Sequence, residues 1–327
     1  MVHHVPLVPN TLLKIACLIA SGAEVWVTNP SSFMKPHPKA IAQLLAHQIN
    51  YVDDLRQLSG KRFDIYFDCG GELHQALGKP TLGAVELTAS GDQYYRKQHL
   101  EYPVISIDQT LTKQLETIFG SAESVPLAIS QLAKINPKQK RWVIFGFGKI
   151  GRGIAYYCKS NKIDVTIVDN TQTALESATA LGLNNRHTSQ YHELQSVICH
   201  ADIIVSATGQ KNTLAAYPRD WFNHKLLANM GIYDEYGAQF SKKDVLNAKQ
   251  PVNFSLDDPT PMKYIDPEFY AHNIAALHLI KENMPHQVHD LCEAVDNHII
   301  NTWCQHHHHP ITTIKKWFIP RTKNTPR

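Results

Sequence analysis

The sequence predicts an α/β protein made of two domains, each built on a parallel β-sheet. Three observations support this prediction. Short apolar runs alternate with helical patterns over residues 2–120. A glycine-rich turn then joins an apolar run to a helical pattern near residue 146, and further apolar runs follow it. At 327 residues, the chain is also long enough for two hydrophobic cores.

The first predicted domain covers residues 1–135 and takes back helices from residues 265–305. Its strands are short β-branched or apolar runs, and its helices show the apolar period of an amphipathic helix. Gly22 closes the first of these helices. The predicted helices span 11–21 and 39–47, and the predicted strands span 23–27, 63–67, 84–86 and 104–107.

Polar residues follow two of these strands. Asp68 and Cys69 come after one buried strand, and Glu86 and Thr88 come after the next. Because parallel strands present their carboxyl ends to ligands, these residues are candidates for a binding or catalytic site. The other interpretation is a helix N-cap or a tight turn at each strand end. The sequence leaves both interpretations open.

A long helix over 110–134 is predicted to run from the first domain to the second, and a turn at 136–138 follows it. The apolar strand after this turn leads into three spaced glycines. Gly146 permits the tight turn, Gly148 lets the backbone approach a pyrophosphate, and Gly151 lets the next helix pack closely on the strand.

The helix after the glycine turn begins with Lys149 and Ile150. Its unpaired N–H groups and partial positive charge favour phosphate binding. The next strand ends in Asp169, 18 residues beyond Gly151. A carboxylate there accepts hydrogen bonds from a ribose diol and repels a 2′-phosphate, so NAD is favoured over NADP. Residues 136–264 are therefore predicted to form a Rossmann-like, doubly wound domain.

Further strands of this domain are predicted at 203–206, 226–229 and 252–254. The first two end in small residues, Thr208 with Gly209 and Asn229 with Gly231. Such residues let a flat ring or a sugar approach the backbone, although a tight turn alone would also explain them. Two such endings in one dinucleotide-binding sheet favour contact with the cofactor.

Two helices, over 266–283 and 290–304, are predicted to return to the first domain and act as hinge helices. A basic, His-rich tail over 306–327 follows, and residues 315–327 are predicted to be partly disordered. Four consecutive histidines at 306–309 do not converge on one tetrahedral ion, so no metal site is predicted.

Composition excludes several classes of protein. The net charge of +3 (32 basic minus 29 acidic residues) is too small to indicate a nucleic-acid partner. No apolar run reaches the roughly 20 residues of a membrane span, so no membrane partner is expected. Six cysteines without a CxxC pair predict free thiols in a reducing cytoplasm.

Several segments resemble the adenosylhomocysteinase family, NAD-dependent hydrolases of S-adenosylhomocysteine. The resemblance is closest over 141–240, where GFGKIGRG, Asp169, ATGQKNT and NMGIYDE occur in family order. It is weaker over FDCGGEL, GAVELTASG, DQTLTK and FGSAES in the first domain. It implies a tightly held NAD that oxidises the ribose 3′-hydroxyl, followed by loss of homocysteine and addition of water.

The resemblance also assigns residues. It implies that the three glycines contact the pyrophosphate and Asp169 contacts the adenosine ribose. Thr208 and Asn229 would contact the nicotinamide side, and Thr88 would reach the cofactor from the first domain. Lys113 matches an active-site lysine of the family.

The substrate half departs from the family pattern. Cys69 stands where the family has a catalytic aspartate, and Leu87 where it has a substrate-binding glutamate. Pro6 aligns best with a family histidine, with His3 and His4 close by. Loss of one acid/base group lowers a rate by about 10²- to 10⁴-fold, so losing three predicts that little of the parent reaction remains.

The leading prediction is an NAD-dependent oxidoreductase that acts on a small-molecule alcohol, a nucleoside or a hydroxy acid. Lys113 would assist proton removal, Asp68 or Glu86 would orient it, and Cys69 would line the pocket as a small buried side chain. A functional adenosylhomocysteine hydrolase and a non-catalytic NAD-binding regulatory protein are the alternatives. A homo-oligomer, dimer or tetramer, is expected.

Overall fold

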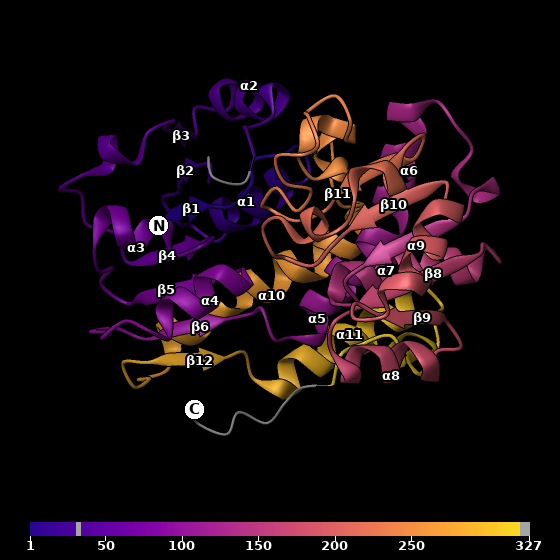
Figure 1. Ribbon diagram of the computed structural model, residues 1–327. Coiled ribbons are helices and arrows are strands. Elements are labelled where there is room, and N and C mark those ends of the chain that lie inside the picture. The colour runs from indigo at the N-terminus through magenta and orange to yellow at the C-terminus, as the bar shows by residue number, and fades with distance from the viewer. Residues whose placement is uncertain (31–33, 321–327) are drawn as a thin grey trace. The chain divides into compact units, whose positions relative to one another are not determined.

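The computed structural model describes residues 1–30 and 34–320. It contains two compact units. Unit 1 consists of Met1–Gln114 and Met262–His309, and unit 2 of Leu115–Pro261 and the segment from Pro310. Each unit has a parallel β-sheet covered by helices (Figure 1). The predicted fold class, two Rossmann-like doubly wound α/β domains, is confirmed.

The sheet of unit 1 has seven strands in the order β12-β6-β5-β4-β1-β2-β3 (Figure 1). Chain order reverses between β1 and β4, and in such sheets ligands bind outside the carboxyl ends of strands at this reversal. The strands are β1 Val2–His4, β2 Trp26–Thr28, β3 Asn50–Tyr51, β4 Ile65–Asp68, β5 Gly83–Glu86, β6 Val104–Ser106 and β12 Val288–Asp290.

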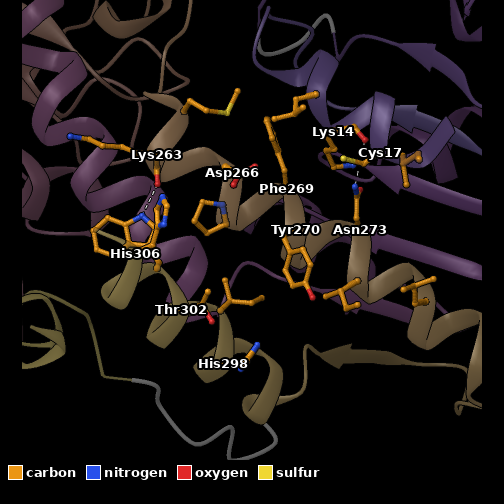
Figure 2. Close-up of a pocket in the computed structure, with 18 of the residues that line it drawn as sticks. Lys14, Cys17, Lys263, Asp266, Phe269, Tyr270, Asn273, His298, Thr302 and His306 are labelled. Carbon is orange, nitrogen blue, oxygen red and sulfur yellow. Dashed lines mark hydrogen bonds between the residues drawn. The ribbon is translucent and has the colours of Figure 1, made fainter. Parts of the chain in front are cut away.

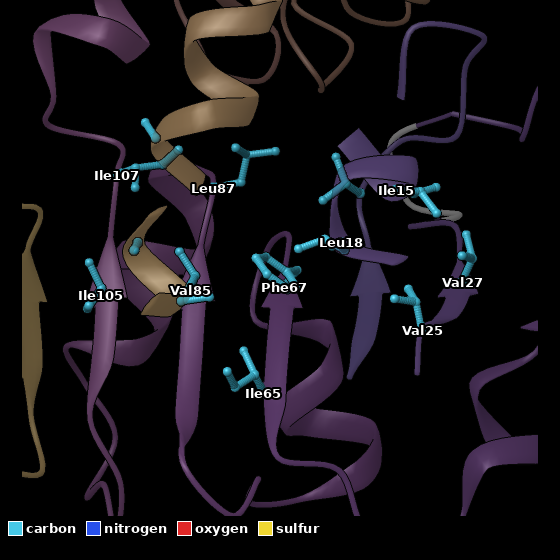
Figure 3. Close-up of a cluster of buried hydrophobic side chains, with 14 of the residues drawn as sticks. Ile15, Leu18, Val25, Val27, Ile65, Phe67, Val85, Leu87, Ile105 and Ile107 are labelled. Atoms are coloured by element: carbon cyan, nitrogen blue, oxygen red, sulfur yellow. The ribbon is translucent and has the colours of Figure 1, made fainter. Parts of the chain in front are cut away.

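Apolar side chains cover both faces of this sheet. Phe67, Val85 and Ile105 lie on neighbouring strands and belong to one buried cluster with Ile15 and Leu18 of α1 (Figure 3). The alternate residues of the same strands form a second cluster with α3 and α4 on the other face. The helices are α1 Thr11–Ala20, α2 Pro38–Ala46, α3 Glu72–Leu77, α4 Ala89–Tyr95, α5 Leu111–Gln114, α10 Met262–Lys281 and α11 Glu293–His306.

The sheet of unit 2 has five strands in the order β11-β10-β7-β8-β9, so its chain order reverses between β7 and β10. The glycine turn follows β7, one of the two strands at this reversal. The strands are β7 Trp142–Phe145, β8 Val165–Asp169, β9 Asn184–His187, β10 Ile203–Ser206 and β11 Leu226–Asn229. The helices are α6 Gly120–Ala133, α7 Lys149–Ser160, α8 Gln172–Ala180, α9 Tyr191–His200 and α12 Ile311–Lys315.

The long helix predicted over 110–134 is interrupted. A π-helical turn over Leu115–Phe119 separates α5 from α6. Phe119 packs edge-on against Tyr156 of α7, with ring centroids 4.9 Å apart, so this segment belongs to unit 2. The change of unit at Gln114 therefore comes earlier than the predicted boundary at residue 135.

The strand predicted over 252–254 is wrong. Val252–Ser255 forms a single 3₁₀ turn after Pro251, in which the Phe254 N–H donates to the Pro251 carbonyl. Among the residues that the structure describes, an isolated bridge between Leu227 and Val245 is the one pairing that extends the sheet beyond β11. A β-branched residue beside a proline therefore does not suffice to predict a strand when no neighbouring strand pairs with it.

The tail differs from the prediction of disorder over residues 315–320. Trp317 is 2% exposed and packs edge-on against Tyr156. The ring centroids of Phe318 and Phe119 are 6.2 Å apart. Both aromatic side chains therefore extend the core of unit 2. The predicted disorder over 321–327 lies outside the described residues.

The predicted helices over 266–283 and 290–304 correspond to α10 and α11, and the histidine run ends α11. The His309 ring stacks on Trp303 with centroids 5.3 Å apart. All six cysteines are free. Within the described ranges, no helix combines the length and apolar character needed to cross a membrane.

Candidate functional site

The glycine turn between β7 and α7 is closely packed at two of its glycines and open at the third. Gly146 has a φ of +94°, and a Cβ there would lie 2.5 Å from the Ala207 carbonyl oxygen. A Cβ on Gly151 would lie 1.9 Å from the Gly146 carbonyl oxygen. A Cβ on Gly148 would meet nothing within 4 Å. The open side of the turn therefore adjoins Gly148 and the N–H groups that begin α7 with Lys149, which is where the sequence predicts a pyrophosphate.

Asp169, at the end of β8, organises this turn. Its Oδ2 accepts the Phe147 N–H at 2.8 Å, and its Oδ1 accepts the N–H and hydroxyl of Thr171 at 2.9 and 2.8 Å. A carboxylate has about four acceptor positions, so Asp169 retains capacity for a ribose hydroxyl. The sequence predicted that Asp169 contacts a ribose, but it did not predict the hydrogen bond from the Phe147 N–H to Asp169.

Glu235 occupies the carboxyl ends of β10 and β11. This carboxylate is 0% exposed and accepts the Thr208 N–H and hydroxyl at 2.9 and 2.7 Å. It also accepts the Gly209 N–H at 2.7 Å and the Ser206 hydroxyl. The loop predicted to contact nicotinamide is therefore fixed by a residue that the sequence analysis did not single out. Its one signal was its place at the end of the NMGIYDE segment.

Asn229 and Gly231 serve the same region. The Asn229 side-chain amide donates to the carbonyls of Gly231, Tyr233 and Lys249 at 3.0, 2.9 and 2.7 Å. A Cβ on Gly231 would lie 2.0 Å from Glu235 Oε1, so the glycine leaves room for the carboxylate. Both residues hold the loop together, and their contact with a cofactor stays a prediction.

In unit 1, Asp68 caps the loop that follows β4. Its Oδ1 accepts the N–H groups of Cys69 and Leu73 at 2.8 and 3.1 Å, and its Oδ2 accepts the Tyr95 hydroxyl at 2.5 Å. The side chain is fully buried. Of the two interpretations that the sequence left open for Asp68, the geometry matches the turn and cap.

Glu86 has the same role at the end of β5. It accepts the N–H groups of Gly70 and Gly71 at 3.0 and 3.1 Å, and the N–H and hydroxyl of Thr88 at 2.7 Å each. Burial, followed by the charge of Asp68, raises the pKa of Glu86 to about 8. The Thr88 hydroxyl also caps α4 by accepting the Gly91 N–H at 3.1 Å.

Lys113 lies at the end of α5 and meets a different acid from those predicted. Its Nζ donates to Glu268 Oε1 on α10 at 2.7 Å. Glu268 is buried, and Lys113 is mostly so. The sequence analysis did not name Glu268, and orientation of Lys113 by Asp68 or Glu86 stays a prediction. Sequence analysis missed this pair because 155 residues separate its members.

Cys69 is 1% exposed, and burial, followed by the charges of Glu86 and Asp68, raises the pKa of its thiol well above the ordinary value. A thiol in such surroundings stays protonated and behaves as a small apolar side chain. Lys113 also acts on this thiol electrostatically, with the opposite sign. The structure thus brings the predicted residues of unit 1 to the carboxyl ends of β4 and β5 and to α5.

His4, at the carboxyl end of β1, is a further polar residue of this edge. One ring nitrogen contacts the Thr28 hydroxyl, and Nε2 lies 3.1 Å from Glu72 Oε2. His3 precedes it and faces the other side of the sheet, 6.1 Å from the Phe67 ring. The alternating direction of side chains along a strand explains why adjacent histidines have different surroundings.

A groove of about 1050 Å³ lies elsewhere on unit 1, between α1, α10 and α11. Figure 2 shows Lys14 and Cys17 of α1 facing Tyr270 and Asn273 of α10, with His298 nearby. Its lining is mostly apolar, and it includes none of the residues that the sequence predicted for catalysis or cofactor binding.

Comparisons with known proteins match mainly nucleotide-binding and adenosylhomocysteinase sequences. The family model described as shikimate/quinate 5-dehydrogenase matches residues 127–219. The chain is 27% identical over 275 residues to an adenosylhomocysteinase of Aeropyrum pernix, covering 76% of this chain and 64% of that protein. It is 26% identical over 226 residues to the adenosylhomocysteinase of Sulfolobus acidocaldarius, covering 63% and 53%. The resemblance to this family is thus confirmed as a distant one.

The chain spans about half to two thirds of the length of these relatives. Among solved structures, a dipicolinate synthase polypeptide from Bacillus halodurans superimposes with a TM-score of 0.53 at 11% identity. That match covers 85% of this chain and 98% of the other. At this identity the likeness shows the fold alone.

Proposed function

We propose that this chain binds NAD through unit 2 and acts as an NAD-dependent oxidoreductase on an alcohol, either a nucleoside or a hydroxy acid. The observation that carries the proposal is the β7–α7 turn, which is closely packed at Gly146 and Gly151 and open at Gly148. This geometry fits a pyrophosphate against the start of α7. The dehydrogenase family match over residues 127–219 supports the same cofactor class.

Bound NAD would supply a hydride acceptor. The N–H groups at the start of α7 would bind its pyrophosphate, and Asp169 would accept hydrogen bonds from its ribose. The loop that Glu235 holds, with Thr208 and Gly209, would lie against the nicotinamide. Thr88 would make its contact from unit 1, as the family resemblance implies.

Lys113 is the proposed acid/base group for the alcohol. As the free amine, Lys113 would accept the proton of the carbinol hydroxyl while the hydride leaves for NAD. Glu268, 2.7 Å from the Lys113 Nζ, would stabilise the ammonium that forms. Cys69 would contribute shape to the site and no proton transfer, because its thiol stays protonated.

The test begins with the purified protein. Mass spectrometry should find NAD after denaturation, and a panel of nucleosides and 2-hydroxy acids should include one that reduces the bound cofactor. Lys113→Met should lower that rate by about 10²- to 10⁴-fold. Lys97→Met, which changes an exposed lysine of the same unit, is the control. A reaction that persists unchanged in Lys113→Met contradicts the assignment of this lysine.

The distant similarity to adenosylhomocysteinases favours a second candidate, hydrolysis of S-adenosylhomocysteine. Release of free thiol from this compound would establish it. Binding of NAD without reduction by any alcohol and without thiol release would instead favour the non-catalytic regulatory protein.

A further inference from the structure

Arg152 is a buried cation in unit 2 that the proposed function does not yet use. It is the fourth residue of α7 and is 4% exposed. One of its terminal nitrogens donates to the Ser177 hydroxyl on α8 at 2.8 Å. Its Nε has no hydrogen-bond partner, and no acidic side chain within the described ranges pairs with it. Burial lowers the pKa of this guanidinium below its ordinary value.

The guanidinium lies against the glycine turn. Its central carbon is 4.6 Å from the ring centroid of Phe147, the residue between Gly146 and Gly148. The Phe147 N–H in turn donates to Asp169. The buried charge therefore lies against the side chain of a residue within the glycine turn.

A buried cation without a counter-charge destabilises a folded chain, because it loses hydration and gains no ion pair. The Phe147 ring offers only a partial compensation. An anion at the start of α7 would supply the missing charge, and the open space in front of Gly148 admits one.

We infer that Arg152 is a positioning residue that binds no ligand atom itself and supplies, through Phe147, the counter-charge for the phosphates of a bound dinucleotide. The inference rests on the proposed binding of NAD in unit 2. The ligand class is a nucleotide with a diphosphate group, and an uncharged nucleoside gains nothing from this charge.

The distinguishing variants are Arg152→Met, which keeps most of the volume and removes the charge, and Arg152→Lys, which keeps the charge and loses the planar stack. Lys159→Met is the matched control, since it removes a lysine at the opposite end of the same helix. The probes are NADH, ADP and adenosine, each titrated against the full chain by calorimetry, and the melting temperature without ligand is recorded.

Arg152→Met should bind NADH and ADP about tenfold more weakly than the wild type, with adenosine unchanged. Its melting temperature without ligand should be equal to or above that of the wild type. Arg152→Lys should bind NADH within about threefold of the wild type. If Arg152→Met does not fold, Arg152→Gln provides the same comparison.

Equal loss of NADH affinity in Arg152→Lys and Arg152→Met would show that the stack rather than the charge matters, and would overturn the inference. So would an unchanged affinity in Arg152→Met. A wild-type chain that binds neither NADH nor ADP would overturn the proposed function itself.

Discussion

At the scale of single residues, unit 1 holds basic side chains in its apolar core. Lys14 is 1% exposed, and its Nζ lies 4.1 Å from the centre of the Phe67 ring without a hydrogen-bond partner among the described residues. His272 lies against the same ring, and His3 stands on the neighbouring strand. Burial, the largest cause in each case, lowers the pKa of all three groups well below their ordinary values.

Lys14→Met should raise the free energy of unfolding by about 1–3 kcal/mol, because an apolar side chain of similar length replaces a buried amine. Urea unfolding at pH 7 measures this change. Lys97→Met, on the surface of the same unit, should change stability by less than about 0.5 kcal/mol. A destabilised Lys14→Met would mean that the amine makes a favourable contact in solution.

Stability should also fall as the pH decreases below about 6.5. The folded pKa of His272 is lowered by burial and by the nearby charges of Lys14 and Lys113, so below pH 6.5 the unfolded chain binds protons that the folded chain does not. The pKa of His3 is lowered by burial and by the charges of Lys14, His272 and His4, so His3 acts in the same direction. Each histidine contributes a slope of up to about 1.4 kcal/mol per pH unit.

Urea unfolding between pH 5 and pH 8 tests this dependence. His272→Gln should flatten the decline, since glutamine can keep the hydrogen bond to the Val85 carbonyl without titrating. The same change at the exposed His47 should leave the curve unaltered. An equally steep decline in His272→Gln would contradict the assignment.

At the scale of elements, buried acidic side chains organise the loops at the strand ends of both sheets. Asp68 and Glu86 hold the loops after β4 and β5, and Glu235 holds the loops after β10 and β11. Each accepts several backbone N–H groups that a tight turn would otherwise leave unpaired. These acids keep the loop backbone in one conformation at the carboxyl ends of the strands.

Glu235→Gln should destabilise unit 2 by about 1–3 kcal/mol and weaken NADH binding, because an amide nitrogen cannot accept the hydrogen bonds of Thr208 and Gly209. Chemical unfolding and an NADH titration measure the two effects. Glu176→Gln, at an exposed position on α8, should change neither. Weaker binding with full stability would indicate that Glu235 touches the cofactor directly.

At the scale of the whole molecule, the chain leaves unit 1 at Gln114, completes the main body of unit 2 by Pro261 and then returns. Each unit has its own parallel sheet and its own apolar core. A ligand that binds one unit should therefore stabilise that unit first.

Hydrogen exchange with and without NADH tests this expectation. At about one hundred times the dissociation constant, NADH should stabilise unit 2 by about 2.7 kcal/mol. Amides of β7, α7 and β10 should exchange more slowly, while the strands of unit 1 provide an internal reference. Protection that appears first in unit 1 would contradict binding of the cofactor to unit 2.

Local patterns predicted most elements of the fold. The β-branched runs of β7, β8 and β10 and the glycine turn carry their own signals, because a buried parallel strand needs continuous apolar residues. By contrast, β1 begins Val2-His3 and β9 is Asn-Asn-Arg-His, and neither run is apolar. Those strands form because neighbouring strands supply their hydrogen bonds, which is a property of the assembled sheet.

The sequence by itself determined the α/β class, the glycine-rich cofactor motif and the acid, Asp169, that follows this motif at the expected spacing. Each of these depends on residues close together in the chain. The tertiary structure decided which acids are used. Asp68 and Glu86 accept hydrogen bonds from the backbone of neighbouring loops, and Lys113 pairs with Glu268. Glu235 accepts hydrogen bonds from Thr208, and Arg152 is buried against Phe147 of the glycine turn. These outcomes depend on burial and on contacts between distant segments, and no local pattern encodes either.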